Sequence, residues 1–215
     1  ADLHAGRGNL VFNGHRFSGS PLIFLDIAQR EQLQHQALFF EQDPAELAQL
    51  HAAVSHLNGT MPVLNGDPCE VGMRRWLASI PSQWNRLGLV YADPIAKEIP
   101  HALLAAVAKK LPQVDLLSYV SATAYKRRRG VDLGRGRLDE HIHAVGKKYV
   151  RIREPLGMHQ WTFILWTNWD KFPEWRNIGL YRLESEHGTR ILNRLTMTSE
   201  EWHAATNTPL FEVDQ

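Results

Sequence analysis

The chain has 215 residues, of which 44% are hydrophobic and 22% charged, and this balance excludes a disordered chain. A single cysteine excludes an internal disulfide framework and a zinc site built from several cysteines, and no apolar run approaches the ~18 residues of a membrane helix. The formal net charge of +1, taken alone, argues against a strongly basic nucleic-acid-binding protein. We expect one cytoplasmic domain over residues 1–215, with no membrane partner.

The first nine residues are predicted to be the end of a strand followed by a tight loop that contains Gly6 and Gly8. Because a longer strand normally precedes such a loop, we expect an N-terminal strand or extension to be missing. Turn signals at 13–14 and 18–19 predict a loop over residues 10–19. Ser20 followed by Pro21 is typical of a helix start, and this helix is expected to run to about Leu33.

Strands and helices then alternate along the chain. Apolar runs predict strands at 37–41, 62–67, 87–94 and 114–125, with helices at about 44–57, 70–80 and 98–111. A further helix is expected at about 138–146, and strands at 161–167 and 178–183 are predicted to form an antiparallel pair. The alternation predicts an α/β fold with a doubly wound, mostly parallel sheet and a C-terminal antiparallel strand pair.

Acidic residues follow four successive predicted strands: Asp2, Glu41, Asp67 and Asp93. The carboxyl ends of parallel strands are where ligands bind in such sheets, although each acid alone could equally cap a helix. A carboxylate at Glu41 suits a ribose diol, since it accepts two hydroxyl hydrogen bonds. The first loop lacks the third glycine of a dinucleotide-binding motif, and Asp2 would repel a pyrophosphate. The Asp2 carboxylate suits a cationic ligand such as a sulfonium, so these residues favour S-adenosylmethionine as cofactor.

These positions resemble the Rossmann-like S-adenosylmethionine-dependent methyltransferases over about residues 1–125. The loop Asp2-Leu3-His4-Ala5-Gly6-Arg7-Gly8 and the later Gly19-Ser20-Pro21 are similar to the three-Cys-motif partner family. His4-Ala5-Gly6, Gly19-Ser20-Pro21-Leu22 and Gly88-Leu89 leading to Asp93-Pro94 are similar to ribosomal RNA adenine-N6 methyltransferases of the RlmJ type. The resemblance implies a Rossmann-like fold and a transferase with Asp93 and Pro94 as catalytic residues. It implies cofactor binding by Asp2, His4, Ala5, Gly6, Gly8, Glu41, Gln42, Asp67 and Pro68.

One departure from that pattern bears on the acceptor. Amino methyltransferases of adenine or cytosine carry a second proline and an aromatic residue after the catalytic acid and first proline, but here Ile95 and Ala96 follow. No aromatic ring at this point can stack a flipped base. Two alternatives therefore stay open beside a methyltransferase of nucleic acid or another phosphate-bearing substrate. One is a nucleic-acid or protein-partner-binding module that has lost catalysis, and the other is a small-molecule methyltransferase.

The charge is strongly segregated along the chain. Residues 126–153 hold ten Lys and Arg against three Asp and Glu, so this segment carries +7 and the rest of the chain −6. It begins just past a predicted strand end, and we interpret it as a basic insert at the rim of the active site. The residues expected to bind nucleic-acid phosphates are Lys126, Arg127, Arg128, Arg129, Arg135 and Arg137.

Three further features each allow two interpretations. Cys69 could be a nucleophile like that of cytosine-C5 enzymes, but a lone cysteine is more often an inert small residue. His141 and His143 could bind a metal, but we favour solvated polar residues and predict no metal site. Trp169 or Trp175 could stack a base, but we favour an aromatic core that also includes Trp161 and Trp166.

Overall fold

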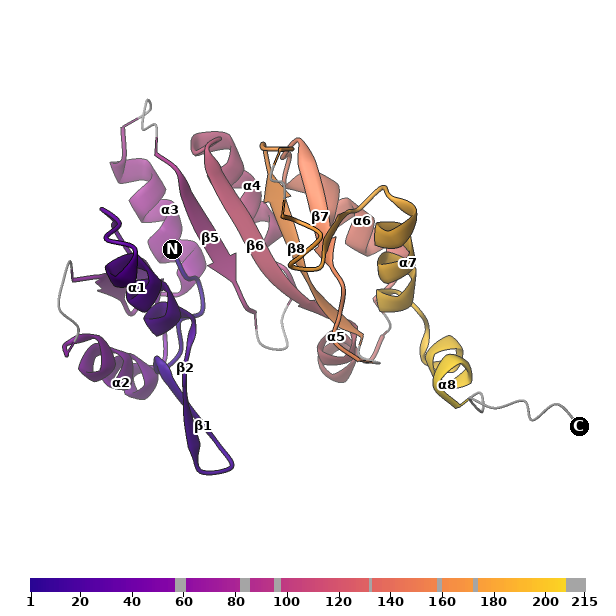
Figure 1. Ribbon diagram of the computed structural model, residues 1–215, viewed down its shortest axis with the longest axis horizontal. Coiled ribbons are helices and arrows are strands. Elements are labelled where there is room, and N and C mark those ends of the chain that lie inside the picture. The colour runs from indigo at the N-terminus through magenta and orange to yellow at the C-terminus, as the bar shows by residue number, and fades with distance from the viewer. Residues whose placement is uncertain are drawn as a thin grey trace, which may run out of the picture. The chain divides into compact units, whose positions relative to one another are not determined.

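The structure is a computed structural model of the chain, and it describes residues 1–56, 61–81, 86–94, 98–131, 133–157, 160–171 and 174–207. The chain divides into two compact units, residues 1–93 and 94–215, and each is described by itself (Figure 1). Ile95 and Ala96, which mark the departure from amino methyltransferases, lie outside the described residues.

The first unit contains five strands and three helices among its described residues. In chain order they are β1 (Asn9–Phe12), β2 (His15–Ser18), α1 (Ser20–Arg30), β3 (Leu38–Phe40), α2 (Pro44–Val54), β4 (Val63–Asn65), α3 (Cys69–Ser79) and β5 (Gly88–Ala92). The predicted helices and strands after residue 20 are all present; most are shorter than expected, and α3 begins and ends one residue earlier. The predicted loop over 10–19 is wrong, because β1 and β2 form an antiparallel hairpin there.

The main strands of the first unit run parallel. Strand β3 pairs with β4 in parallel, and Asp2 forms parallel bridges to both Phe39 and Tyr91. The N-terminal segment therefore lies between β3 and β5, and the spatial order is β4, β3, the N-terminal segment, β5. Because these strands are parallel, the residues that follow them lie at one edge of the sheet.

Local packing explains how the helices of this unit are placed. The Asp43 side chain caps α2 by accepting hydrogen bonds from the backbone N–H groups of Ala45 and Glu46, at 2.8 and 3.2 Å. Gly72 lets α3 approach β3 closely, since a Cβ at this position would lie 2.5 Å from the Phe40 ring. One buried apolar cluster joins the first loop, α1, β3 and α2 through Ala5, Leu25, Ala37, Phe39, Leu50 and Val54.

The second unit combines helices with antiparallel strands. Its described elements are α4 (His101–Lys110), β6 (Val114–Ser121), α5 (Ala122–Arg129), α6 (Arg135–Ala144), β7 (Tyr149–Arg153), β8 (Trp161–Thr167), β9 (Leu180–Arg182), α7 (Glu186–Leu195) and α8 (Ser199–Asn207). Strand β8 pairs with β6 and with β7, and β7 pairs with β9, in every case antiparallel.

The mixed α/β class is confirmed, but a mostly parallel sheet is not, because the strand pairs within the second unit are antiparallel. The C-terminal strands β8 and β9 are not partners of each other either, because β7 lies between them. The predicted strand 114–125 ends at Ser121, whose hydroxyl accepts from the Ala124 N–H at 3.1 Å and caps α5. None of the described helices has the length and hydropathy that crossing a bilayer requires.

Candidate functional site

The loop after the N-terminal segment is shaped by two glycines in the left-handed region. Gly6 has φ +59° and Gly8 has φ +79°, which are backbone conformations that residues other than glycine adopt only with strain. A Cβ at Gly8 would lie 3.0 Å from Leu50, whereas a Cβ at Gly6 would have no neighbour within 4 Å. The Gly19 N–H donates to the Gly8 carbonyl at 2.6 Å and ties the start of α1 to the loop. The loop is thus packed on one side and leaves open space at Gly6.

Asp2 lies beneath this loop and is only 4% exposed. Its carboxylate accepts hydrogen bonds from the Ser20 hydroxyl at 2.5 Å and from the His4 N–H at 3.0 Å. Burial raises the pKa of Asp2, and the nearby charge of Asp93 adds to the rise. The Gly19-Ser20-Pro21 motif is evident in the sequence, but nothing in it indicates that Ser20 is the partner of Asp2. The structure gives that motif a physical role: Gly19 anchors the loop and Ser20 satisfies the buried carboxylate.

Glu41 follows β3 and faces the same loop. Its Oε2 accepts from the Gly6 N–H and its Oε1 from the Asp43 N–H, each at 2.9 Å. These two backbone bonds fix the orientation of the carboxylate. A carboxylate offers about four lone-pair positions, so two backbone bonds leave acceptor capacity at both oxygens. Glu41 is therefore held in place and still able to accept hydrogen bonds from a ligand.

Asp67 follows β4 and lies in an ordered turn. Its backbone N–H donates to the Asn65 side chain at 2.8 Å, and its carboxylate forms an ion pair with Arg75 of α3 at 2.6 Å. Two residues later, the Cys69 sulfur lies 3.8 Å from Nε2 of His4. The loops that follow the N-terminal segment and β4 are thus in contact.

Asp93 follows β5, where Oδ2 accepts a hydrogen bond from the Tyr91 hydroxyl at 3.3 Å. Burial raises the pKa of the Asp93 carboxyl. Pro94, which comes next, is buried and is the first residue of the second unit. Tyr91 gives Asp93 a positioning partner that sequence reasoning did not identify, because an i, i+2 pair at a strand end carries no motif of its own.

The remaining predicted cofactor residues differ in their surroundings. Ala5 is buried, and its N–H donates to the Phe40 carbonyl at 2.9 Å, so it contributes backbone rather than a side chain. Gln42 is exposed beside Glu41, and Pro68 is exposed at the N-terminal end of α3. The closest grouping of predicted residues is therefore Gly6 with Glu41, with Asp2 below the loop.

The basic segment is distributed over α5, α6 and β7. On α5, Lys126 and Arg127 are exposed, while the side chains of Arg128 and Arg129 lie outside the described residues. Arg135 on α6 donates to the Asn193 side chain at 2.6 Å. Arg137 lies 3.7 Å from Glu98 and 5.6 Å from the ring centre of Tyr125. Part of this charge is thus used within the second unit, and its place at an active-site rim stays a prediction.

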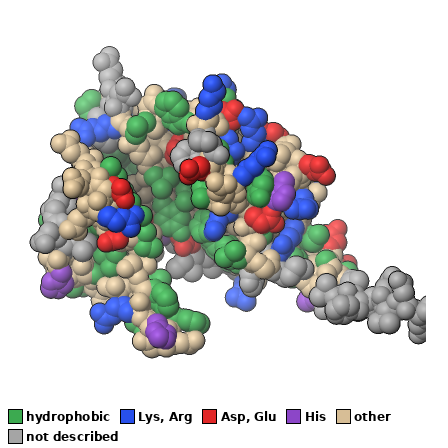
Figure 2. Space-filling model, in the orientation of Figure 1, with side chains coloured by type: hydrophobic (Ala, Val, Ile, Leu, Met, Phe, Trp, Pro, Cys, Tyr) green, Lys and Arg blue, Asp and Glu red, His purple; other side chains and the backbone are tan. Residues whose placement is uncertain are grey.

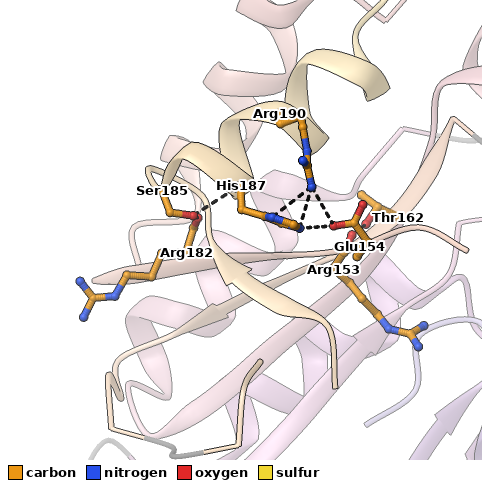
Figure 3. A network of polar contacts seen from close by, with 8 residues as sticks. Arg153, Glu154, Thr162, Arg182, Ser185, His187 and Arg190 are labelled. Atoms are coloured by element: carbon orange, nitrogen blue, oxygen red, sulfur yellow. Dashed lines mark hydrogen bonds and ion pairs between the residues drawn. The ribbon is translucent and has the colours of Figure 1, made fainter. Parts of the chain in front are cut away.

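The end of the basic segment borders a polar network on β7 and α7. Figure 3 shows Glu154, just after β7, facing His187 and Arg190 of α7. The His187 ring also stacks on Tyr181 at 3.7 Å between ring centres. Ser185 caps α7 by accepting from the Gly188 N–H at 3.1 Å. We interpret this network as what holds α7 against the strands.

The structure bears on the interpretations of the tryptophans and of His141. Trp166 is fully buried and donates to the Ile142 carbonyl at 3.0 Å, whereas Trp169 is 52% exposed. The prediction that His141 is solvated is wrong, because its ring is buried and stacks on His101 at 4.2 Å. Among the described residues, no group of three or more His, Cys, Asp or Glu side chains could hold a metal ion.

Comparison with known proteins places the fold. No family model and no curated protein matches this chain in sequence. Among solved structures, the chain resembles protein LPL1258 from Legionella pneumophila str. Philadelphia 1, a member of family DUF519. The TM-score is 0.57 at 16% sequence identity, and the match covers 82% of this chain and 79% of that one. At this identity the likeness concerns the fold alone.

Proposed function

We propose that this chain is an S-adenosylmethionine-dependent methyltransferase acting on nucleic acid or another phosphate-bearing substrate. The observation that carries the proposal is the Glu41 carboxylate, held by the N–H groups of Gly6 and Asp43 at 2.9 Å with acceptor capacity remaining. It lies at the carboxyl edge of the parallel strands, beside a loop whose Gly6 faces open space. The order β4, β3, N-terminal segment, β5 also corresponds to the first four positions, 3-2-1-4, of the Rossmann strand order.

The residues present fit this cofactor. Glu41 would accept hydrogen bonds from the ribose hydroxyls, and Asp67 would contact the adenine. The loop from Asp2 to Gly8 would hold the methionine part, with backbone rather than side chains closest to it, as the glycines permit. The buried Asp2 supplies negative charge beneath a cation. The cofactor, when bound, supplies an electrophilic methyl group on a sulfonium.

Asp93 would act at the reacting centre. Its carboxylate is oriented by the Tyr91 hydroxyl, and burial raises its pKa, which suits a group that accepts a hydrogen from the attacking atom. The rate would come mainly from alignment of the acceptor with the methyl group in a dry site. Pro94 would restrict the backbone conformation after Asp93 and so help to keep the Asp93 side chain in place.

The substrate class rests on charge. Exposed Lys126 and Arg127 belong to a 28-residue segment of net charge +7, and such a segment attracts phosphates. A methyltransferase for a small molecule would not need this segment, and its substrate binding would depend little on salt.

Transfer of a labelled methyl group to total DNA, RNA and protein tests the proposal. We expect labelled nucleic acid with the wild-type chain and no labelling with Glu41→Ala. The control is Glu31→Ala, which changes an exposed acid at the C-terminal end of α1. Cofactor binding without transfer to any of the three acceptors would favour the binding module that has lost catalysis. Methyl transfer to a small-molecule acceptor that is insensitive to salt would favour a small-molecule methyltransferase.

A further inference from the structure

The hairpin β1–β2 presents large apolar side chains to solvent. Leu10 is 56% exposed, Val11 70%, Phe12 68% and Phe17 51%. In Figure 1 the hairpin projects from the first unit, and in Figure 2 hydrophobic side chains gather at its tip beside a histidine. Single exposed apolar residues are ordinary, but four on one short hairpin are a concentration that marks a binding surface.

The register of the hairpin sorts its side chains onto two different faces. Leu10 lies opposite Phe17, and Phe12 lies opposite His15. Because side chains alternate along a strand, these four residues share one face, and Val11 with Arg16 belongs to the other face. The first face therefore carries three rings and one aliphatic side chain, and we call it the ring face.

The hairpin is well defined although it is exposed. Asn13 and Gly14 form its two-residue turn with φ values of +49° and +76°, the pattern of a type I′ turn that matches the twist of the strands. At its base, the Gly19 N–H donates to the Gly8 carbonyl at 2.6 Å. The ring face is thus attached directly to the loop that holds Gly6.

We infer that the ring face binds unpaired bases of a single-stranded nucleic acid, and this inference rests on the proposed function. Aromatic rings on a β-surface stack with bases of any sequence, and cations beside them bind the backbone phosphates. Residues 9–18 contain no acidic residue, and Arg16, although its side chain belongs to the opposite face, lies between His15 and Phe17 in the same strand, so the hairpin as a whole complements a polyanion. Pairing of two copies through the ring face would instead leave Arg16 on the opposite face with no acidic partner on the hairpin. A single strand is therefore the occupant that suits both the rings and the charge.

Fluorescence anisotropy with a labelled single-stranded RNA of about 12 nucleotides tests the inference on the whole chain. We expect Phe12→Ala and Phe17→Ala each to weaken binding about fivefold or more, and the double variant to weaken it further. Val11→Ala removes an equally exposed side chain from the opposite face and should change affinity less than about twofold.

Two further variants separate stacking from plain hydrophobic contact. Phe12→Leu and Phe17→Leu keep the hairpin apolar and folded but remove the rings, so they should lose RNA affinity as the alanine variants do. Wild-type affinity in the double leucine variant would overturn the inference. A wild-type dimer that the double variant converts to a monomer in sedimentation would also overturn it, because the face would then join two copies.

Failure of RNA binding by the ring face can be distinguished from failure of cofactor binding. Calorimetry with S-adenosylmethionine on the same double variant should give the wild-type cofactor affinity. Cofactor binding by a wild-type chain that binds no single-stranded RNA would refute the inference and leave cofactor binding intact. Ring-dependent RNA binding by a chain that does not bind the cofactor would support the ring face and refute the methyltransferase.

Discussion

Gly72 offers a direct test of how α3 supports the site. It lies inside a helix, where replacement of glycine by alanine normally stabilises by up to about 1 kcal/mol. Here the new Cβ would lie 2.5 Å from the Phe40 ring and 3.1 Å from the Asn65 side chain. Phe40 is only 1% exposed and cannot move aside freely, so α3 must shift away from β3. Because Phe40 immediately precedes Glu41, that shift would also disturb the carboxylate that we assign to cofactor binding.

The expected magnitude follows from two opposing effects. Overpacking a core costs about 1–3 kcal/mol, and the gain in helix propensity offsets up to about 1 kcal/mol of it. Since the ring is closely packed, we expect Gly72→Ala to lower the free energy of unfolding by about 1–2 kcal/mol. For a chain of this size that corresponds to a fall of about 2–8 °C in the unfolding temperature.

Gly136→Ala is the matched control for this measurement. Gly136 also lies within a helix, α6, but a Cβ there would have no neighbour within 4 Å. It should therefore leave the unfolding temperature unchanged or raise it. Thermal unfolding followed by circular dichroism compares both variants with the wild type. A Gly72→Ala variant as stable as Gly136→Ala would refute the close approach of α3 to β3.

Other variants probe separate parts of the structure. Trp166→Phe leaves a buried carbonyl without its donor and should cost about 2 kcal/mol in urea-induced unfolding; no loss would contradict the Nε1 hydrogen bond. Asp43→Ala removes the cap of α2 and should cost about 1 kcal/mol in the same assay, whereas Asp43→Asn should cost much less. Burial lowers the pKa of His141 below its ordinary 6.5, so the unfolded chain binds more protons below that pH and stability falls as the pH is lowered through 6.5. His141→Gln should weaken this fall in urea titrations at several pH values, and the exposed His143→Gln should not; equal effects would argue against a buried His141.

Local signals are enough to predict the helices of the first unit and its strands after residue 20. Pro21 and Pro44 each lie in the first turn of a helix, and Asp43 caps α2, because such residues act on their own backbone neighbours. The expectation that Ser20 caps α1 is wrong, because Gly19 is the N-cap there and the Ser20 hydroxyl donates to Asp2. Asn13-Gly14 indicates a turn, but the strands of the hairpin at residues 9–18 have no buried face, so no alternation of apolar and polar residues marks them in the sequence. Strand β7 separates β8 from β9, which depends on pairing between segments far apart in sequence.

The candidate site was predictable in composition but not in its contacts. The positions of Glu41 and Asp93 after strands follow from the sequence, because apolar runs mark where strands end. That Gly6 orients Glu41, or that Ser20 satisfies the buried Asp2, depends on groups 35 and 18 residues apart that only the fold brings together. No local motif reports such contacts.

Calorimetric titration of the whole chain with S-adenosylmethionine tests the central claim most directly. We expect one binding event for the wild type and for Glu31→Gln, and at least a tenfold loss of affinity for Glu41→Gln with an unchanged circular dichroism spectrum. A folded wild-type chain that binds no cofactor, or a Glu41→Gln variant that binds it with unchanged affinity, would contradict the account.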